Sequence, residues 1–297
     1  MTAYLSFPIK ATALAKLRTA GITVTVNPNK DRPKGADLAK IIQNYDIIMI
    51  GVAQTLTKDM LAKITSPKII ATMSIGLDHI DPAFLLSSHV RIANIKYANA
   101  TSVAEHIFAL TLALSHRLTD PATHRNDLYE RTADISGKTI GFIGAGNITR
   151  EAMRFATAFG MRILCHTRNP REHRDLNADF VTLDELLKQS DIINISLPLN
   201  KQTHGVITKQ KIALMKPTAI FINTARAELV DINALVARAD KTPTFYVGLD
   251  IDLDEHKNLF KKPRRNVIVT PHTAGISKEA IDRMDDEIVA EILNLIG

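Results

Sequence analysis

Hydrophobic residues in the first third of the chain fall into short β-rich runs, separated by longer segments with one apolar face. The short runs predict strands, and the longer segments, each closed by Gly or a polar turn, predict helices. Strands that alternate with helices are typical of a parallel sheet covered by helices. The predicted strands cover residues 3–7, 22–26, 46–51, 68–74 and 90–95, and the predicted helices cover residues 11–21, 35–45 and 57–64.

A second series of apolar runs predicts a second parallel sheet. These runs are nearly continuous in apolar residues, as expected of strands whose two sheet faces are both buried. They cover residues 139–144, 162–167, 179–183, 191–197, 219–225, 246–251 and 267–272.

Two further segments set the expected domain boundaries. Residues 99–118, rich in Ala and Leu, predict one long helix between the two sheets, and residues 277–296 predict a terminal amphipathic helix. With the terminal helix packed back on the first sheet, the first domain is discontinuous. We therefore expect one domain of residues 1–98 plus 276–297 and a second domain of residues 99–275.

Composition narrows the class of protein. At 297 residues, 45% hydrophobic and 23% charged, the chain is long enough for two domains with sizeable cores. Cys165 is the only cysteine, which excludes an intrachain disulfide, and its apolar run predicts a buried, inert thiol. No apolar run reaches the roughly 18 residues that span a bilayer, and the N-terminus lacks the order of a signal peptide. We expect a cytoplasmic protein with no membrane partner.

The net charge of +6 suits a small anionic ligand. It also permits weak association with nucleic acid, but the sequence contains no nucleic-acid-binding motif. We interpret the charge as a solvated basic surface and expect no nucleic-acid partner. His79, His106 and His116 lie in or beside predicted helices and lack the spacing of metal ligands, so no metal site is expected.

A glycine turn joins a strand to a helix within KTIGFIGAGNITREAMRFATAFG, residues 138–160. Gly144 permits the tight turn, and Gly146 lets the backbone approach a pyrophosphate at the positive end of the helix. The third position of the motif usually carries Gly, and here it is Thr149. The strand before the turn and the helix after it favour nucleotide binding over an ordinary βα turn.

Ionisable side chains follow three predicted strands in the last third of the chain. Arg226 lies beyond one strand, Asp250 and Glu255 beyond the next, and His272 beyond the last. Ligands of open α/β sheets bind outside the carboxyl ends of the strands, so one crevice would receive these side chains. Taken singly, each is better interpreted as structural: Arg226 as a surface ion pair, Glu255 as a solvated acid and His272 as a hydrogen-bonded loop residue. Together, beside a nucleotide turn, they favour an active site.

Six stretches occur in one order along nearly the whole chain: TMSIGLDHID, TSVAEHIFALTLALSHR, GKTIGFIGAGNI, INTARAELVD, GLDIDLDE and TPHTAG. In addition, Glu255 lies 29 positions after Arg226, and His272 lies 17 positions after Glu255. In these stretches and spacings the chain resembles the D-isomer-specific 2-hydroxyacid dehydrogenase family. TMSIGLDHID is most similar to the glyoxylate and hydroxypyruvate reductase branch.

The resemblance implies an α/β protein with two doubly wound parallel-sheet domains, a Rossmann nucleotide-binding domain inserted in a flavodoxin-like substrate domain. Arg226 would bind the substrate's carboxylate and ketone. His272 would be the general acid, and Glu255 would orient it and keep it protonated. The N–H groups of Ile75 and Gly76 would hold the carboxylate. The resemblance also implies that the cofactor is lined by Val103, Gly144, Gly146, Asn147, Ile148, Leu197, Pro198, Thr224, Ala225, Asp250, His272 and Gly275.

Some positions depart from the family's usual pattern. Thr149 replaces the third glycine, which predicts looser packing of helix on strand; Ala227 follows the arginine in place of Gly; and His256 follows the glutamate in place of Pro. None of these changes removes a reacting group. The family's usual Trp before the nucleotide domain is also absent, because the chain contains no Trp, although Tyr129 lies nearby.

The implied function is reduction of a small 2-keto acid, such as glyoxylate or hydroxypyruvate, by a nicotinamide cofactor. One alternative is NAD-dependent oxidation of a phosphorylated hydroxyacid such as 3-phosphoglycerate. Another is a dinucleotide-sensing protein of the same fold without useful turnover, against which the intact Arg226, Glu255 and His272 argue. The family also implies a homodimer built largely through the helix between the domains.

The choice of cofactor depends on ILCHTRNP, residues 163–170. An acidic residue expected near the end of this strand would bind a ribose 2′-hydroxyl, but Thr167 and Arg168 occupy the matching positions. Thr167 can donate a hydroxyl proton, and Arg168 can grip a phosphate through two N–H groups. We therefore expect NADP as the cofactor, with NAD as the alternative. The nearby Arg171 and Arg174 are better interpreted as a solvated helix face, and Glu172 and Asp175 would have to fold back to restore an acidic contact.

Overall fold

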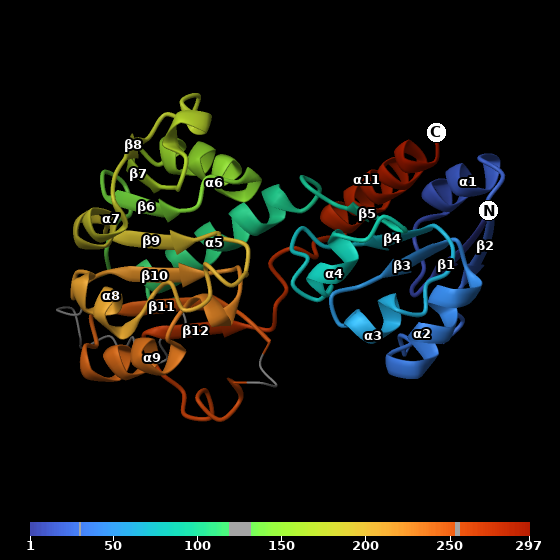
Figure 1. Ribbon diagram of the computed structural model, residues 1–297. Coiled ribbons are helices and arrows are strands. Elements are labelled where there is room, and N and C mark those ends of the chain that lie inside the picture. Colours follow the sequence, from blue (N-terminus) through green and yellow to red (C-terminus); the bar gives the residue numbers. More distant parts are fainter. Residues whose placement is uncertain (30, 119–131, 253–255) are drawn as a thin grey trace. The chain divides into compact units, whose positions relative to one another are not determined.

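The computed structural model describes residues 1–29, 31–118, 132–252 and 256–297. The chain divides into two compact units (Figure 1). The first consists of Met1–Asn99 together with Lys278–Gly297, and the second of Ala100–Ser277. The chain thus leaves the first unit once and returns to it for its last helix. The boundaries expected from the sequence lie one and two residues from these divisions.

The first unit is built on a five-stranded parallel sheet with the strand order β2-β1-β3-β4-β5. Alternate residues of β3 pack on opposite faces, because Ile47 and Met49 join a cluster with α1 and α11 whereas Ile48 and Ile50 join one with α2. The strands are β1 (Thr2–Leu5), β2 (Thr23–Val26), β3 (Ile47–Ile50), β4 (Lys68–Thr72) and β5 (Val90–Asn94). The helices are α1 (Ala11–Thr19), α2 (Gly35–Asn44), α3 (Lys58–Leu61), α4 (Pro82–Leu85) and α11 (Lys278–Ile296).

The second unit is built on a seven-stranded parallel sheet with the order β12-β11-β10-β9-β6-β7-β8. Its strands are β6 (Thr139–Ile143), β7 (Arg162–His166), β8 (Asp179–Phe180), β9 (Ile192–Ile195), β10 (Ile220–Asn223), β11 (Tyr246–Asp250) and β12 (Val267–Thr270). Its α-helices are α5 (Ala100–Ser115), α6 (Asn147–Ala158), α7 (Leu183–Gln189), α8 (Lys209–Leu214) and α9 (Ile232–Lys241), with short 3-10 helices η1 (Pro170–His173) and η2 (Ala227–Leu229).

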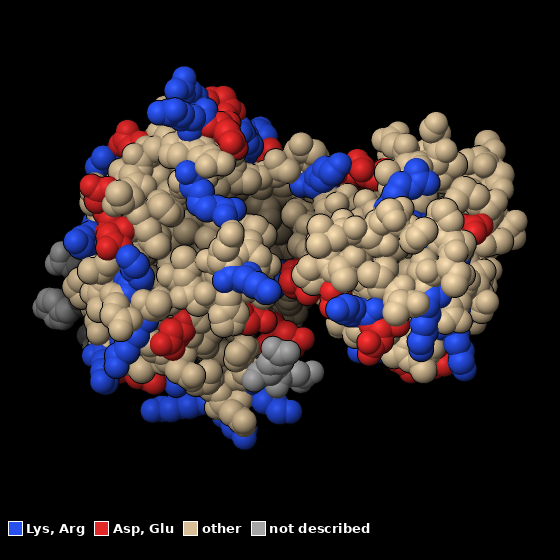
Figure 2. All heavy atoms as spheres, in the orientation of Figure 1, with Lys and Arg blue, Asp and Glu red and all other residues tan. Residues whose placement is uncertain are grey.

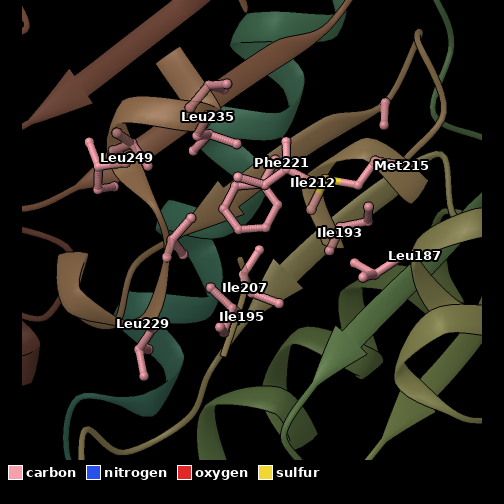
Figure 3. Packing of buried hydrophobic residues seen from close by; sticks show 14 of the residues in the cluster. Leu187, Ile193, Ile195, Ile207, Ile212, Met215, Phe221, Leu229, Leu235 and Leu249 are labelled. Carbon is pink, nitrogen blue, oxygen red and sulfur yellow. The ribbon is translucent and has the colours of Figure 1, made fainter. Parts of the chain in front are cut away.

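Helices cover both faces of the second sheet. Phe221 of β10 packs in the cluster of Figure 3, together with residues of α7, α8 and α9. Its neighbours Ile220 and Ile222 belong to the opposite cluster, which α5 and α6 complete. Helix α5 lies close to the sheet, since a Cβ at Gly248 of β11 would be 3.2 Å from the Cβ of Leu110. The second sheet is therefore buried on both faces, as its apolar runs indicate.

The expected fold class is confirmed, because both sheets are entirely parallel and doubly wound. In the second sheet the strand order reverses between the neighbours β6 and β9, and in the first between β1 and β3. Such switch points are where ligands of open α/β sheets bind.

Every predicted strand is present, but most elements are shorter than the sequence indicated, and the causes are evident for α3 and β8. Helix α3 ends at Leu61, because Lys63 and Ile64 donate to carbonyls three residues back and wind the chain into tighter turns. Strand β8 ends at Phe180, because Thr182 begins α7 through a capping box with Glu185.

The surface shown in Figure 2 carries interspersed positive and negative side chains over both units, separated by uncharged ones. No helix in the described part of the chain is long and apolar enough to cross a membrane.

Candidate active site

The nucleotide turn lies at the switch point of the second sheet, where β6 ends beside β9. Gly144 has φ +107°, and a Cβ there would lie 2.5 Å from the carbonyl oxygen of Ser196. Only glycine adopts this conformation readily, and only glycine fits under Ser196. The residues expected after β9, Leu197 and Pro198, continue from Ser196 along the same edge of the sheet. The turn therefore holds the ends of the two switch-point strands together.

The N-terminus of α6 suits an anion. Its N-cap, Gly146, has no side chain to accept from the first-turn N–H groups, and the first turn contains no acidic residue. A Cβ at Gly146 would meet no atom within 4 Å, so the backbone is open to a ligand. Asn147 and Ile148 form the start of the helix, and Thr149 is fully buried within it. These features fit the pyrophosphate of a dinucleotide.

The chain just beyond the end of β7 carries a cation, Arg168. Arg168 is exposed, and its Nη1 donates to Oε1 of Gln202 over 2.7 Å. Glu172 accepts from the side chain of Asn169 over 3.0 Å. Thr167, the other expected residue, is half-buried beside Arg168.

Asp175 does not fold back to the end of β7 either. It forms an ion pair with Arg150 of α6. The Arg150 hydrogen bond holds the pKa of the Asp175 carboxyl below its ordinary value, so this carboxylate stays charged and bound to α6. Asp175 is thus engaged by Arg150, and Glu172 by Asn169.

Arg226 follows β10 on a loop shaped by a buried amide. The side chain of Asn223 accepts from the N–H of Ala225 over 2.9 Å and donates to the carbonyl of Arg226 over 2.8 Å. Arg226 is half-buried, and its Nη1 donates to the carbonyl of Ala225 over 2.9 Å. Thr224, within the loop, is buried. The sequence did not point to Asn223, although an Asn that ends a fully apolar strand is a usable signal.

His272 follows β12 in a strained conformation, with φ +54°. A residue other than glycine seldom adopts this region, at a cost of about 1–3 kcal/mol, unless its surroundings enforce it. Here Asp250, at the end of β11, accepts from the N–H of Thr273 over 2.8 Å and from the N–H of Ala274 over 2.9 Å. The hydroxyl of Thr270 also donates to Asp250, over 2.5 Å. A buried carboxylate thus holds the loop on both sides of His272.

Strands β10, β11 and β12 are neighbours, so their carboxyl ends lie along one edge of the second sheet. The strands that carry Arg226 and His272 are two strand spacings apart, roughly 10 Å. Glu255, the third expected catalytic residue, and Tyr129 lie outside the described residues. Of the remaining expected residues, Val103 is buried in α5, Ala225 lies in the Arg226 loop and Gly275 ends the His272 loop.

In the first unit, Ile75 and Gly76 follow β4 on a loop whose carbonyls are occupied. Ser74 donates to the carbonyl of Gly76 over 2.7 Å, and Asn94 donates to that of Ile75 over 3.4 Å. Within the described residues, the N–H groups of Ile75 and Gly76 have no hydrogen-bond partner. Two free N–H groups on one loop suit a carboxylate.

The expectations for Asp81 and Cys165 are confirmed by the local geometry. Asp81 caps α4 by accepting from the N–H of Ala83, with Pro82 at the first helical position. Cys165 is buried, and burial raises the pKa of its thiol to about 11. In the described part of the chain no three His, Cys, Asp or Glu side chains form a group that could hold a metal ion.

Comparison with known proteins identifies the family. Residues 107–274 match the family model described as D-isomer specific 2-hydroxyacid dehydrogenase, NAD binding domain. The chain is 33% identical over 270 residues to hydroxypyruvate reductase of Thermotoga maritima, covering 88% of this chain and 88% of that one. The chain belongs to the D-isomer specific 2-hydroxyacid dehydrogenase family. It is also 32% identical over 285 residues to glyoxylate reductase of Thermococcus litoralis, covering 90% of this chain and 84% of that one.

A solved structure similar to this member of the D-isomer specific 2-hydroxyacid dehydrogenase family is an acyclic imino acid reductase in complex with NADPH and D-Arg. It has a TM-score of 0.87 and 26% identity, covering 100% of this chain and 97% of that chain. The resemblance to the family, drawn from sequence motifs, is confirmed. Together, the family model and this neighbour support an oxidoreductase that uses a nicotinamide dinucleotide.

Proposed function

We propose that the protein reduces a small 2-keto acid, such as glyoxylate or hydroxypyruvate, with NADPH and gives the D-2-hydroxy acid. The observation that carries the proposal is the edge of the second sheet. There Arg226 and His272 follow β10 and β12, each on a loop that a buried polar side chain holds in place. The same edge carries the glycine turn at the switch point. The reductases of Thermotoga maritima and Thermococcus litoralis support the same substrate class.

The chain's own residues would bind and orient the substrate. The Arg226 guanidinium, a planar fork of N–H donors, would hold carboxylate and ketone oxygens together. The free N–H groups of Ile75 and Gly76 would hold the carboxylate as well. A nicotinamide, when bound, supplies the hydride that reduces the ketone carbon.

His272 would supply the proton. It must hold a proton on its imidazole and release it to the ketone oxygen as that oxygen becomes negative. Glu255 would orient the imidazole and favour its protonated form through its charge. The product is then a hydroxy acid, and His272 must take up a proton before the next turnover.

The end of β7 supports NADPH over NADH. A carboxylate there would accept from a 2′-hydroxyl and repel a 2′-phosphate, but the adjacent Glu172 and Asp175 bond to Asn169 and Arg150. Arg168 is exposed and keeps further N–H groups beyond the one that Gln202 accepts. These N–H groups can meet a 2′-phosphate.

We also propose that the protein is a homodimer built largely through α5, that the second unit binds the dinucleotide and that the first binds the substrate. Sedimentation analysis tests the assembly. A monomer at micromolar concentration contradicts it.

The function is tested by assaying glyoxylate, hydroxypyruvate, pyruvate and phosphohydroxypyruvate with NADPH and with NADH, followed by chiral analysis of the product. We expect glyoxylate or hydroxypyruvate to give the highest kcat/KM, and hydroxypyruvate to give D-glycerate. Turnover of phosphohydroxypyruvate alone, with NADH, would instead support a phosphorylated hydroxyacid dehydrogenase. Cofactor binding without turnover of any 2-keto acid would support a dinucleotide-sensing protein.

A further inference from the structure

Two polar side chains of α5 point at the loop that carries His272. Ser102 and His106 are four residues apart, which places them on one face of the helix. Ser102 Oγ donates to the carbonyl of Ala274 over 2.7 Å. His106 Nε2 lies 2.9 Å from Oγ1 of Thr270. The helix is thus bonded to the loop on both sides of His272.

The direction of the bonds follows from the proton count. The Thr270 hydroxyl has one proton. Its contact with the Asp250 carboxylate is short, 2.5 Å, and a hydrogen bond to a carboxylate is stronger than one to a neutral acceptor, so the hydroxyl donates to Asp250. Thr270 must then accept from His106, so Nε2 of His106 carries a proton. The result is a continuous chain from His106 through Thr270 to Asp250, whose carboxylate is only 1% exposed and also receives the N–H groups of Thr273 and Ala274.

We propose that Ser102 and His106 are positioning residues that hold His272 in its reactive place. This proposal rests on the proposed function, in which His272 is the proton donor. His272 has a left-handed backbone conformation, which histidine seldom adopts unless the surrounding structure enforces it. Asp250 enforces that conformation through two N–H groups, and His106 and Ser102 fix Asp250 and the far side of the loop to the rigid helix. Without these bonds the loop relaxes, and the imidazole leaves the position needed for proton transfer.

Neither residue has another evident role. Ser102 is buried, and its bond to Ala274 uses its only proton. His106 is partly buried, and no three ligands that could hold a metal ion are grouped in the described part of the chain. His116, by contrast, lies just beyond α5, is exposed and makes no side-chain hydrogen bond with the described residues. It provides a matched control histidine.

The variants are His106→Leu, which keeps the bulk but removes the donor, and Ser102→Ala, which removes one oxygen. His106→Gln is the rescue, because an amide nitrogen can replace Nε2 as the donor to Thr270. His116→Leu is the control. The first measurement is amide hydrogen exchange of the segment 268–276, which needs no turnover. We expect exchange at Thr273 and Ala274 to rise about tenfold in the two disruptive variants, and to stay unchanged in the rescue and the control.

The second measurement is steady-state kinetics on a 2-keto acid. We expect kcat to fall about tenfold in His106→Leu with KM within about threefold, because substrate binding rests on other residues. His106→Gln should recover most of the kcat. A general loss of structure in His106→Leu would instead weaken cofactor affinity as well. In that case kcat is measured on Ser102→Ala, which is the smaller change.

The outcomes separate the two proposals. If His272→Asn abolishes turnover but His106→Leu leaves kcat unchanged, the positioning role is wrong. It is also wrong if exchange at Thr273 and Ala274 does not rise in the His106→Leu, Ser102→Ala double variant. If the wild type reduces no 2-keto acid, the proposed function fails. If exchange at Thr273 and Ala274 still rises in the disruptive variants, Ser102 and His106 nevertheless hold the loop that carries His272.

Discussion

The side-chain amide of Asn223, buried at the end of β10, donates to the backbone carbonyl of Arg226 over 2.8 Å. The same amide accepts from the N–H of Ala225. The short loop that carries Arg226 lies beyond the end of β10, so its backbone cannot use the hydrogen bonds between strands. The buried Asn223 side chain supplies two hydrogen bonds to the loop instead, and these bonds fix the backbone position of Arg226.

Replacing Asn223 by Leu should therefore weaken both the fold and the site. It leaves two backbone groups without partners, so the free energy of unfolding should fall by about 1–3 kcal/mol. The value of kcat/KM for a 2-keto acid should fall more than tenfold in the folded fraction. Denaturant titration and steady-state kinetics measure the two effects.

Asn194 of β9 offers the matched control. It is also buried, and its Oδ1 accepts from the hydroxyl of Ser196 over 2.8 Å, but its side chain bonds to no backbone group of the Arg226 loop, and its Nδ2 has no hydrogen-bond partner in the described structure. Asn194→Leu should leave kcat/KM within about threefold. Equal losses in the two variants would show that any buried Asn has this effect and that Asn223 has no special relation to Arg226.

Arg226→Lys should fold and bind cofactor as the wild type does, yet lose most of its kcat/KM. An ammonium group keeps the charge but cannot hold carboxylate and ketone oxygens in the geometry of the planar fork. The measurements are circular dichroism, cofactor titration and kcat/KM. A loss below about threefold, roughly 0.7 kcal/mol of transition-state binding, would falsify this role.

Glu255→Gln should change the pH dependence of the reaction. In the proposed function, reduction needs protonated His272, so kcat/KM should fall as pH rises through the pKa of that imidazole. A neighbouring carboxylate favours the imidazolium and raises this pKa, so removing its charge should move the fall to lower pH. The measurement is the pH profile of kcat/KM for both proteins. Superimposable profiles would mean that Glu255 does not act on His272.

Periodicity and turn chemistry predicted most of the fold, because strands, helices and the glycine turn are local features. The apolar runs 191–197 and 219–225 became β9 and β10, and the Asp81–Pro82 pair began α4. The sequence did not predict how the loops of the candidate active site are held. His106 contacts Thr270, 164 positions away, and Ser102 contacts Ala274, 172 positions away. Such bonds arise only when α5 packs on the second sheet, and neither the spacing nor the type of these residues predicts them.

Cys165 should be unreactive in the native protein. Burial raises the pKa of its thiol to about 11, and the thiolate is the reactive form. At neutral pH a thiol reagent should therefore modify the folded protein slowly and the denatured protein at once, with one equivalent incorporated. Activity should be unchanged during the slow phase. Rapid modification under native conditions would contradict the burial of this strand.

Arg168 should determine the choice of cofactor. Arg168 lies where an NAD-dependent protein would carry a carboxylate, and the adjacent Glu172 and Asp175 bond to Asn169 and Arg150. A charge-assisted contact to a 2′-phosphate is worth about 1.5–3 kcal/mol, or roughly ten- to a hundredfold. The wild type should therefore have a higher kcat/KM with NADPH than with NADH, and Arg168→Ala should lose most of that preference.

Arg162 gives the control for the loss of one positive charge. It begins the same strand, pairs with Asp179, and lies six residues and so about 20 Å from Arg168. Arg162→Ala should leave the NADPH-to-NADH ratio unchanged, because its charge is screened at that distance. Gln202→Leu should keep the preference or strengthen it, since it frees the Arg168 N–H that the glutamine now accepts. If the wild type uses NADH equally well, or if Arg168→Ala keeps the wild-type ratio, the cofactor is not selected at the end of β7.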